Sequence, residues 1–317
     1  MTRLTLLGPQ RRNPCVAHVI KTRQESGRVA VVTAGWEERE SELDEMRAHL
    51  GEHFETVGLG LCARAEQLFH EDPELLTALQ AHSDQRLRLL ELYRLRLDHA
   101  ADSVYALLAD VDEARAELSR LEADDALRAV QALDARNLQR ISELQARFDE
   151  RWSPETRPAF ADARAEIAER LAACDVLAIA GGHVGVLLDR LHLFGIRALI
   201  GERLVVAWSA GAMACTERVL LFHDSPPQGR GHAEMYAPGL ALAPGLVALP
   251  HARTRLALHD LRRVSALARR CAPATCVCLD EGSRADWDGK AWSIAPGTRW
   301  MTAEGTLAEH AVGSAAT

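Results

Sequence analysis

Short apolar runs that alternate with amphipathic stretches constrain the fold of this chain more than any other feature. The runs are rich in Val, Leu and Ile, and Gly, Pro or charged residues bound them, which is typical of buried strands. They cover residues 3–7, 28–33, 54–60, 175–180, 203–208, 246–249 and 275–279. Amphipathic stretches follow at 37–50, 183–193 and 253–270. This alternation predicts an α/β fold with a mostly parallel, doubly wound sheet that helices cover on both faces.

A turn signal lies near the C-terminus. In the segment ADWDGKAWSI, Asp288-Gly289 separates two short segments of alternating polarity. Such a pair of turn residues predicts a β-hairpin. We therefore expect an antiparallel C-terminal hairpin at an edge of the sheet.

One segment interrupts the alternation of strands and helices. Between Pro73 and Arg151 the chain has no Gly and no second Pro, and it is dense in Leu, Ala, Arg and Glu. Apolar residues recur there at alternating spacings of three and four, which is the heptad seam of a coiled coil. The seam consists of Leu90, Tyr93, Leu97, Ala100, Val104, Leu107, Val111, Ala114, Leu118 and Leu121. We expect all of these residues on one long helix.

A second helix is expected to begin after Ala123, where Asp124 and Asp125 can cap its N-terminus. Its less regular apolar stripe consists of Leu127, Val130, Leu133, Leu138, Ile141, Leu144 and Phe148. The two helices would form an antiparallel coiled-coil hairpin. We therefore divide the chain into an α/β catalytic domain of residues 1–72 and 152–317 and a helical coiled-coil insertion of residues 73–151. Because a heptad seam buries apolar side chains, the insertion should pack on its own domain, form a homodimer or bind a partner protein.

Charge and hydropathy argue against several classes of function. The net charge is -8, and Lys and Arg are interspersed with Asp and Glu, so we expect no nucleic-acid partner. The first apolar run ends at Gly8 and Pro9 and is too short for a signal peptide, and no run of about 18 apolar residues follows it. Seven scattered cysteines are typical of reduced thiols. We therefore expect a cytoplasmic protein without a membrane partner, a cofactor or a metal site.

The reactive residues of a parallel sheet are expected just beyond the carboxyl ends of its strands. Ser209 follows the run at 203–208 and precedes Ala210, Gly211 and Ala212. Small residues permit a tight strand-to-helix turn, and the N-terminus of the helix directs N–H groups at a reacting carbonyl. The pattern G-x-S-x-G is met in part, because Ala207 occupies the position of its first glycine. We interpret Ser209 as a catalytic nucleophile.

A serine nucleophile requires a base and an acid that orients the base. His251 follows the run at 246–249 and is the candidate base. Asp224 lies between Ser209 and His251 in a predicted loop, and the order Ser, Asp, His is one that builds a triad. Spacing leaves three other acids open, which are Glu217, Glu234 and Asp280.

The diglycine Gly181-Gly182 follows the run at 175–180. An oxyanion needs two donors, and a backbone without side chains can approach it closely. The N–H groups of Gly182 and Ala210 are therefore the candidate oxyanion hole.

Four segments together resemble the dipeptidase E and cyanophycinase family of serine peptidases. IAGGHVGVLLDRL is similar to the family's diglycine loop and the helix after it, and VVAWSAGAMA is similar to its nucleophile turn. PGLALAPGLVALPHARTRL resembles the segment that ends in the catalytic histidine, and CVCLDEGSRADWDGKAWSI resembles the C-terminal strand and hairpin. The resemblance covers residues 1–70 weakly and 170–296 well. It implies the class I glutamine amidotransferase-like fold, which is flavodoxin-like.

The resemblance implies that Ser209 is the nucleophile, His251 the base, and Gly182 and Ala210 the oxyanion donors. It favours Asp224 as the acid, because dipeptidase E has an acidic residue at this offset from its nucleophile. The candidates for the substrate pocket are Gly181, His183, Trp36, Trp208 and Arg253. His183 replaces the family's Asn or Asp, so the sequence does not predict a preference for Asp-containing or β-aspartyl substrates.

The sequence therefore predicts a serine peptidase or amidase that cleaves a small peptide or isopeptide bond through an acyl-enzyme. Glutaminase activity is disfavoured, because that chemistry uses Cys at the position of Ser209 in this fold. The alternative is a non-catalytic or repurposed scaffold whose coiled coil mediates oligomerisation or partner binding.

Overall fold

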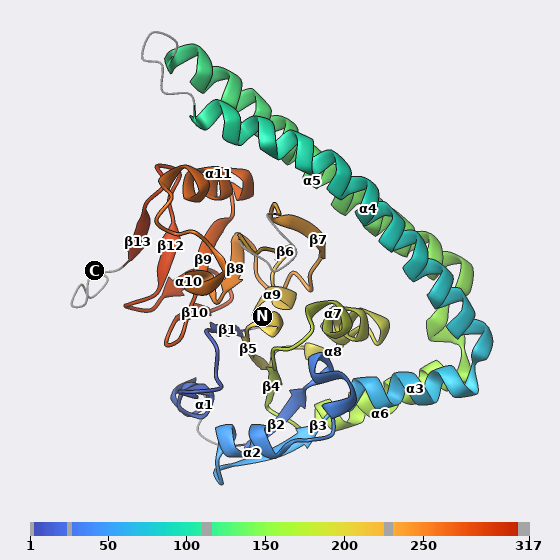
Figure 1. The fold of residues 1–317 in the computed structure, drawn as a ribbon. Helices are drawn as coiled ribbons and strands as arrows, with labels where there is room; N and C mark the ends of the chain where they lie inside the picture. The colour runs from blue at the N-terminus through green and yellow to red at the C-terminus, as the bar shows by residue number, and fades with distance from the viewer. Residues whose placement is uncertain (1–2, 24–26, 110–115, 225–230, 310–317) are drawn as a thin grey trace.

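The central sheet is mostly parallel, as predicted (Figure 1). The computed structural model describes residues 3–23, 27–109, 116–224 and 231–309. Five parallel strands lie in the spatial order β1, β5, β4, β2 and β3, and β10 and β11 extend the sheet antiparallel beyond β1. Their bounds are β1 Arg3–Leu7, β2 Gly27–Val32, β3 Phe54–Gly58, β4 Val176–Ile179, β5 Leu204–Trp208, β10 Arg284–Trp287 and β11 Trp292–Ile294. Strands β10 and β11 form the hairpin expected around Asp288-Gly289.

Helices cover both faces of this sheet. Successive side chains of a strand point to opposite faces, so Val29 and Val31 pack with α1 and α2, whereas Ala30 and Val32 belong to the core on the other face. All four side chains are fully buried, which explains the continuous apolar run in β2. The covering helices are α1 Val16–Arg23 and α2 Asp44–Leu50 on one face, and α3 Leu61–Glu71, α6 Pro158–Ala172, α7 Val184–Leu193, α8 Ile196–Ile200 and α9 Ala210–Cys215 on the other.

Two of the three predicted amphipathic helices are interrupted. The stretch at 37–50 divides into the 3-10 helix η1 (Ala34–Arg39) and α2. The stretch at 253–270 divides into α10 (Ala252–Arg255) and α11 (Leu261–Cys271). The carboxylate of Asp260 accepts the N–H groups of Arg262 and Arg263, and this cap begins a new helix inside the predicted one. A further 3-10 helix, η2, covers Pro154–Thr156.

The last two predicted parallel strands belong to a separate sheet, which corrects the expectation of one continuous sheet. β8 (Leu246–Pro250) and β9 (Thr275–Leu279) are parallel to each other, and β12 (Arg299–Met301) and β13 (Leu307–Glu309) complete their four-stranded sheet. β6 (Arg218–Leu221) and β7 (Glu234–Pro238) form a two-stranded sheet. Apolar runs indicate that a strand exists, but they do not identify its partner.

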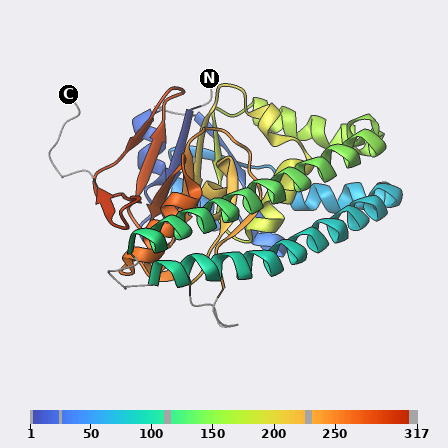
Figure 2. The ribbon, with the colours of Figure 1, turned by 90° about the horizontal axis from the view of Figure 1, so that it is seen from above.

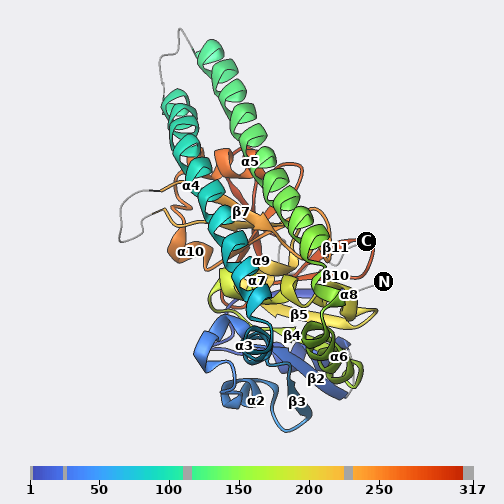
Figure 3. The ribbon, with the colours of Figure 1, turned by 90° about the vertical axis from the view of Figure 1, so that its right-hand side faces the viewer.

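The insertion consists of two long helices, α4 (Pro73–Ala109) and α5 (Ala116–Trp152), which we call the helical hairpin. They lie side by side and antiparallel, with α4 leaving α3 and α5 returning towards α6 (Figures 1 and 3). Viewed from above, both run along the same side of the α/β core (Figure 2). None of the helices in the described ranges is both long and apolar enough to span a bilayer.

The predicted boundary between the two long helices is wrong. α5 begins at Ala116 and continues through Asp124 and Asp125, so these two aspartates do not cap it. Leu118 and Leu121, expected on the first helix, lie on α5, where they are 60% and 50% exposed. Val111 and Ala114 lie outside the described residues. No Gly or Pro occurs in the sequence between Ala109 and Ala116, so the apolar spacing gave no sign that Leu118 and Leu121 lie on another helix.

A buried polar network fixes the hairpin to the α/β core. Arg270 of α11 donates from Nε and Nη2 to the two carboxylate oxygens of Asp134 of α5, each at 2.7 Å, and these side chains are 7% and 5% exposed. The hydroxyl of Tyr93 of α4 donates to Asp134 at 2.7 Å and accepts the N–H of Met235 of β7 at 3.0 Å. Burial and the neighbouring carboxylate raise the pKa of Tyr93, so the hydroxyl keeps its proton. The network therefore joins α4, α5, α11 and β7.

We predict that Asp134→Asn lowers the free energy of unfolding by about 3–5 kcal/mol. The substitution leaves the buried Arg270 charge without a counter-charge. Urea denaturation followed by circular dichroism measures this. The matched control is Asp125→Asn on the same helix, whose ion pair with Arg128 is exposed, so this change should have little effect. Equal destabilisation by the two variants would show that the buried pair does not secure the hairpin.

Candidate active site

The turn that carries Ser209 brings it to His251. Ser209 follows β5 with φ 50° and ψ -122°, and α9 begins at the next residue. This backbone conformation is strained for a residue with a side chain. His251 follows β8 with φ 57°. Ser209 Oγ lies 3.3 Å from His251 Nε2, a hydrogen-bonding distance between a nucleophile and its base. The structure thus brings together the serine and the histidine that the sequence singled out.

The diglycine packs against this turn. A Cβ on Gly181 would lie 2.8 Å from the Cβ of Ser209. Gly182 has φ +116°, and a Cβ there would lie 2.2 Å from the carbonyl oxygen of Gly35. The N–H of His183 donates to the same oxygen at 2.7 Å. The loop between β4 and α7 is therefore held between Gly35 and Ser209, and glycine is required at both positions.

The N–H groups proposed to bind an oxyanion come from this loop and from α9. Ala210 is the first residue of α9, where helix geometry leaves the amide without a carbonyl four residues earlier. Gly182 belongs to the loop that packs against the Ser209 turn. The oxyanion role of these two groups stays a prediction.

The carboxylate of Asp224 has partners other than His251. Its Oδ1 forms an ion pair with Arg263 at 2.5 Å, and its Oδ2 accepts the N–H of Ala257 at 2.7 Å. The N–H of Asp224 also donates to the carbonyl of Arg255 at 2.7 Å. Asp224 thus fixes the chain segment that follows His251, in place of the expected bond to the imidazole.

Asp280, one of the acids that spacing left open, lies next to His251 in the fold. Pro250 of β8 pairs in register with Leu279 of β9, and the N–H of His251 donates to the carbonyl of Leu279 at 3.2 Å. Asp280 is the next residue after that carbonyl. Its side chain is nearly buried, and its carboxylate accepts the N–H of Arg253 at 2.9 Å.

Three environmental effects set the protonation of His251. Burial lowers its pKa below the ordinary value, the charge of Arg255 lowers it further, and the charge of Asp280 raises it. The net direction is downward. The imidazole is therefore neutral near pH 7, the form in which it can accept a proton from Ser209.

The two residues face a pocket of about 780 Å³. Gly181, Trp36 and Trp208, which were predicted pocket residues, line it. His183 is not among the residues that line this pocket, and its Nδ1 accepts the N–H of Val186 at 3.1 Å and so caps α7. A helix cap at this position gives a physical reason for His183 that involves no substrate.

Another arginine takes the place of the predicted one in the pocket. Arg253 is exposed, and its Nε lies 3.6 Å from Asp280 Oδ2, whereas Arg255 lines the pocket beside Ser209 and His251. Residues two apart on a helix point to opposite sides, so α10 turns one arginine away and the other inward. The sequence placed an arginine after His251 but could not select between the two.

Sequence reasoning missed the residues that the hairpin brings to the pocket. Arg94 of α4 lines it and pairs with Glu234 at 2.8 Å, and Glu234 also lines it. His232 lines it too, and its Nε2 lies 3.0 Å from the carboxylate of Asp102 of α4. No local motif marks these residues, because they converge through the docking of the hairpin.

The comparisons with known proteins give matches at the level of structure. No protein-family model matches the sequence, and no curated protein matches it. The structure resembles that of a peptidase from an acI-B1 Actinobacterium, with 11% identity, a TM-score of 0.48, and coverage of 99% of this chain and 96% of the other. It also resembles a Listeria monocytogenes EGD-e protein described as a candidate peptidase E, with 12% identity, a TM-score of 0.45, and coverage of 93% and 98%.

We predict that Gly182→Ala lowers the free energy of unfolding by roughly 2 kcal/mol or more, because a side chain there meets both a strained φ and a clash with backbone. Gly60→Ala is the control, since Gly60 has φ +62° but open space around its Cβ position. The control should lower the free energy of unfolding by about 1 kcal/mol, because only the left-handed φ is unfavourable there. Thermal or urea unfolding measures both. Equal costs would mean that the diglycine is not confined by Gly35.

Proposed function

We propose that this protein is a serine hydrolase, a peptidase or amidase that cleaves a small peptide or isopeptide bond through an acyl-enzyme. The observation that carries the proposal is the pair of Ser209 Oγ and His251 Nε2 at 3.3 Å, at the ends of two strands and in the wall of a large pocket. A serine at a strained strand-to-helix turn beside a histidine is the arrangement that activates a hydroxyl for acyl transfer.

In this reaction Ser209 Oγ attacks the carbonyl carbon of the scissile bond while His251 Nε2 takes the hydroxyl proton. The N–H groups of Gly182 and Ala210 stabilise the oxyanion. His251 then gives its proton to the leaving amine, and the C–N bond breaks to leave an acyl ester on Ser209. A water molecule attacks this ester with His251 again as base, which releases the acid and restores the serine.

We assign Asp280, in place of Asp224, as the acid that supports His251. Asp280 follows the strand that pairs with the strand before His251, and its charge favours the protonated imidazole by raising the pKa of His251. The imidazolium that forms during the reaction is the species that such a carboxylate stabilises. The ion pair of Asp224 with Arg263 gives Asp224 a role in holding the neighbouring backbone.

The fold assignment is part of the same proposal. We place the chain in the class I glutamine amidotransferase-like class, with residues 1–72 and 152–317 as the catalytic domain and 73–151 as the insertion. The parallel sheet and the serine at the end of β5 support this. All seven cysteines are free, which fits a reducing compartment, and we propose that the enzyme acts in the cytoplasm.

The competing function is a scaffold without catalysis, in which the hairpin binds a second copy or a partner protein. This function is favoured by the exposure of Leu118 and Leu121, which are apolar side chains that a binding partner could cover. The reactivity of Ser209 distinguishes a serine hydrolase from a scaffold without catalysis.

We predict that a fluorophosphonate probe labels the wild-type protein and that Ser209→Ala abolishes this labelling, because the probe reacts with an activated serine. Intact-protein mass spectrometry counts the adducts. Ser293→Ala, in the exposed middle position of β11, is the matched control and should be labelled like the wild type. A wild-type protein that takes no label would favour the scaffold function.

We predict that the labelling rate rises with pH as His251 loses its proton. Because the pKa of His251 is lowered, the midpoint should lie below the ordinary histidine value of 6.5. Arg255→Gln removes a positive charge, so the pKa of His251 and the midpoint move up. Asp280→Asn removes a negative charge, so the midpoint moves down and the rate falls roughly 10²- to 10⁴-fold.

Labelling for fixed times across a pH series measures both effects. Midpoints that do not move, or that move the other way, would remove Arg255 and Asp280 from the catalytic environment.

A further inference from the structure

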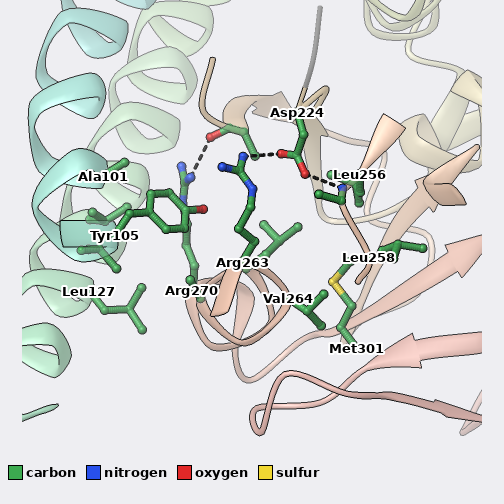
Figure 4. Close-up of a pocket in the computed structure, with 16 residues that line it drawn as sticks. Ala101, Tyr105, Leu127, Asp224, Leu256, Leu258, Arg263, Val264, Arg270 and Met301 are labelled. Atoms are coloured by element: carbon green, nitrogen blue, oxygen red, sulfur yellow. Dashed lines mark hydrogen bonds and ion pairs between the residues drawn. The ribbon is translucent and has the colours of Figure 1, made fainter. Parts of the chain in front are cut away.

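A small cavity of about 30 Å³ lies between the hairpin and the α/β core, beside the segment that follows His251 (Figure 4). Tyr105 of α4 lines it from the hairpin, and Asp224 and Arg263 line it from the core. The cavity is thus a place where the hairpin meets the chain segment that follows His251.

The ring of Tyr105 contacts two residues of the core at once. The guanidinium carbon of Arg263 lies 5.1 Å from the ring centroid, within the range of a cation–π interaction. The imidazole of His232 stacks on the same ring with centroids 5.6 Å apart and planes 11° apart. Partial burial, which raises the pKa of the Tyr105 hydroxyl, also strengthens the cation–π contact relative to an exposed one.

From Arg263, a short series of bonds leads to the segment after His251. Arg263 pairs with the Asp224 carboxylate, which also accepts the N–H of Ala257 (Figure 4). The backbone N–H of Asp224 donates to the carbonyl of Arg255. The N–H of Arg255 in turn donates to the carbonyl of His251 at 3.1 Å. The backbone N–H and the carboxylate of Asp224 thus hold the segment after His251, and Tyr105 of the hairpin contacts the arginine that pairs with this carboxylate.

His232 leads to another wall of the catalytic pocket. It lines that pocket, and Asp102, one turn before Tyr105 on α4, binds its Nε2. The same helix face thus secures both the segment after His251 and the wall that contains His232.

We propose that Tyr105 is a positioning residue of the active site, through which the helical hairpin holds the His251 segment and the His232 wall in their reactive arrangement. This inference rests on the proposed function for its meaning, but its contacts are independent of the reaction. It assigns the insertion a part in catalysis, where the heptad seam alone indicates packing.

The charged groups around His251 come from several elements. Arg255 of α10 and Asp280 after β9 are the charges that act on its imidazole. The other charged or titratable side chains that line the same pocket are Arg11, Arg39, Glu45, Arg94, His223, His232 and Glu234.

Loss of the Tyr105 ring should change the position of Arg255 and, through its charge, the pKa of His251. Without the ring, Arg263 loses its cation–π contact and its pair with Asp224 is held less firmly, so the Asp224 N–H that binds the carbonyl of Arg255 is less fixed. Arg255 is then free to move its guanidinium into solvent. The positive charge next to His251 weakens, and the pKa of His251 rises.

The test compares Tyr105→Ala with Tyr105→Phe, which keeps the ring and both of its contacts. We expect Tyr105→Ala to lower the maximal rate of fluorophosphonate labelling roughly two- to thirtyfold and to move the pH midpoint up towards the ordinary histidine value. Tyr105→Phe should retain the wild-type rate and midpoint. Asp224→Asn should reproduce the upward shift, and the double variant Tyr105→Ala/Asp224→Asn should shift no further, because both act through the same bonds.

Leu90→Ala, which removes a fully buried side chain from the same helix, controls for a general loosening of the hairpin. It should lower stability without moving the midpoint. An unchanged midpoint in folded Tyr105→Ala, or an equal shift in Leu90→Ala, would overturn the inference. If the wild type takes no label, the proposed function fails, whereas NMR titration of His251 in the same variants still decides whether Tyr105 positions it.

Discussion

The buried ion pair between Asp134 and Arg270 constrains how the helical hairpin and the α/β core fit together. Two charges that leave water on folding lose much hydration energy, so they are tolerated only where their hydrogen bonds are nearly all satisfied. Here Arg270 also donates to the carbonyl of Ala233, and the hydroxyl of Tyr93 donates to the carboxylate. Few placements of α4, α5 and α11 could satisfy all these groups. The pair therefore selects one arrangement of the hairpin on the core.

Strand β7 links the docked hairpin to the pocket. The hydroxyl of Tyr93 accepts the N–H of Met235, and the side chain of Asn137 donates to its carbonyl, so β7 is attached to both helices of the hairpin. Glu234 is the residue before Met235, and His232 stands just upstream. One wall of the candidate active-site pocket is thus positioned by the helical hairpin, while Ser209 and His251 are positioned by the strands that precede them. The arrangement of the site therefore depends on how the hairpin is placed relative to the α/β core.

The features that could be predicted from the sequence are those that a local residue pattern determines. Strand β2 could be predicted because both of its faces are buried, and Ser209 and His251 could be predicted because each follows an apolar strand. The sequence favoured Asp224 as the acid, but the fold gives its carboxylate Arg263 and the N–H of Ala257 as partners and brings Asp280 next to His251. The start of α5 was misplaced because no Gly or Pro separates it from α4 in the sequence.

The distance along the chain between Asp134 and Arg270, 136 residues, has a consequence for how the protein is made. The hairpin contains its own local contacts and can form soon after it leaves the ribosome, since proteins rich in local contacts fold fast. Its docking surface, however, waits for α11, which is synthesised much later. During that interval the hairpin side chains that later face the core are uncovered, and Asp134 has Tyr93 of the hairpin but not Arg270 as a partner. A nascent chain of this protein would therefore depend on chaperones most strongly between the synthesis of α5 and that of α11.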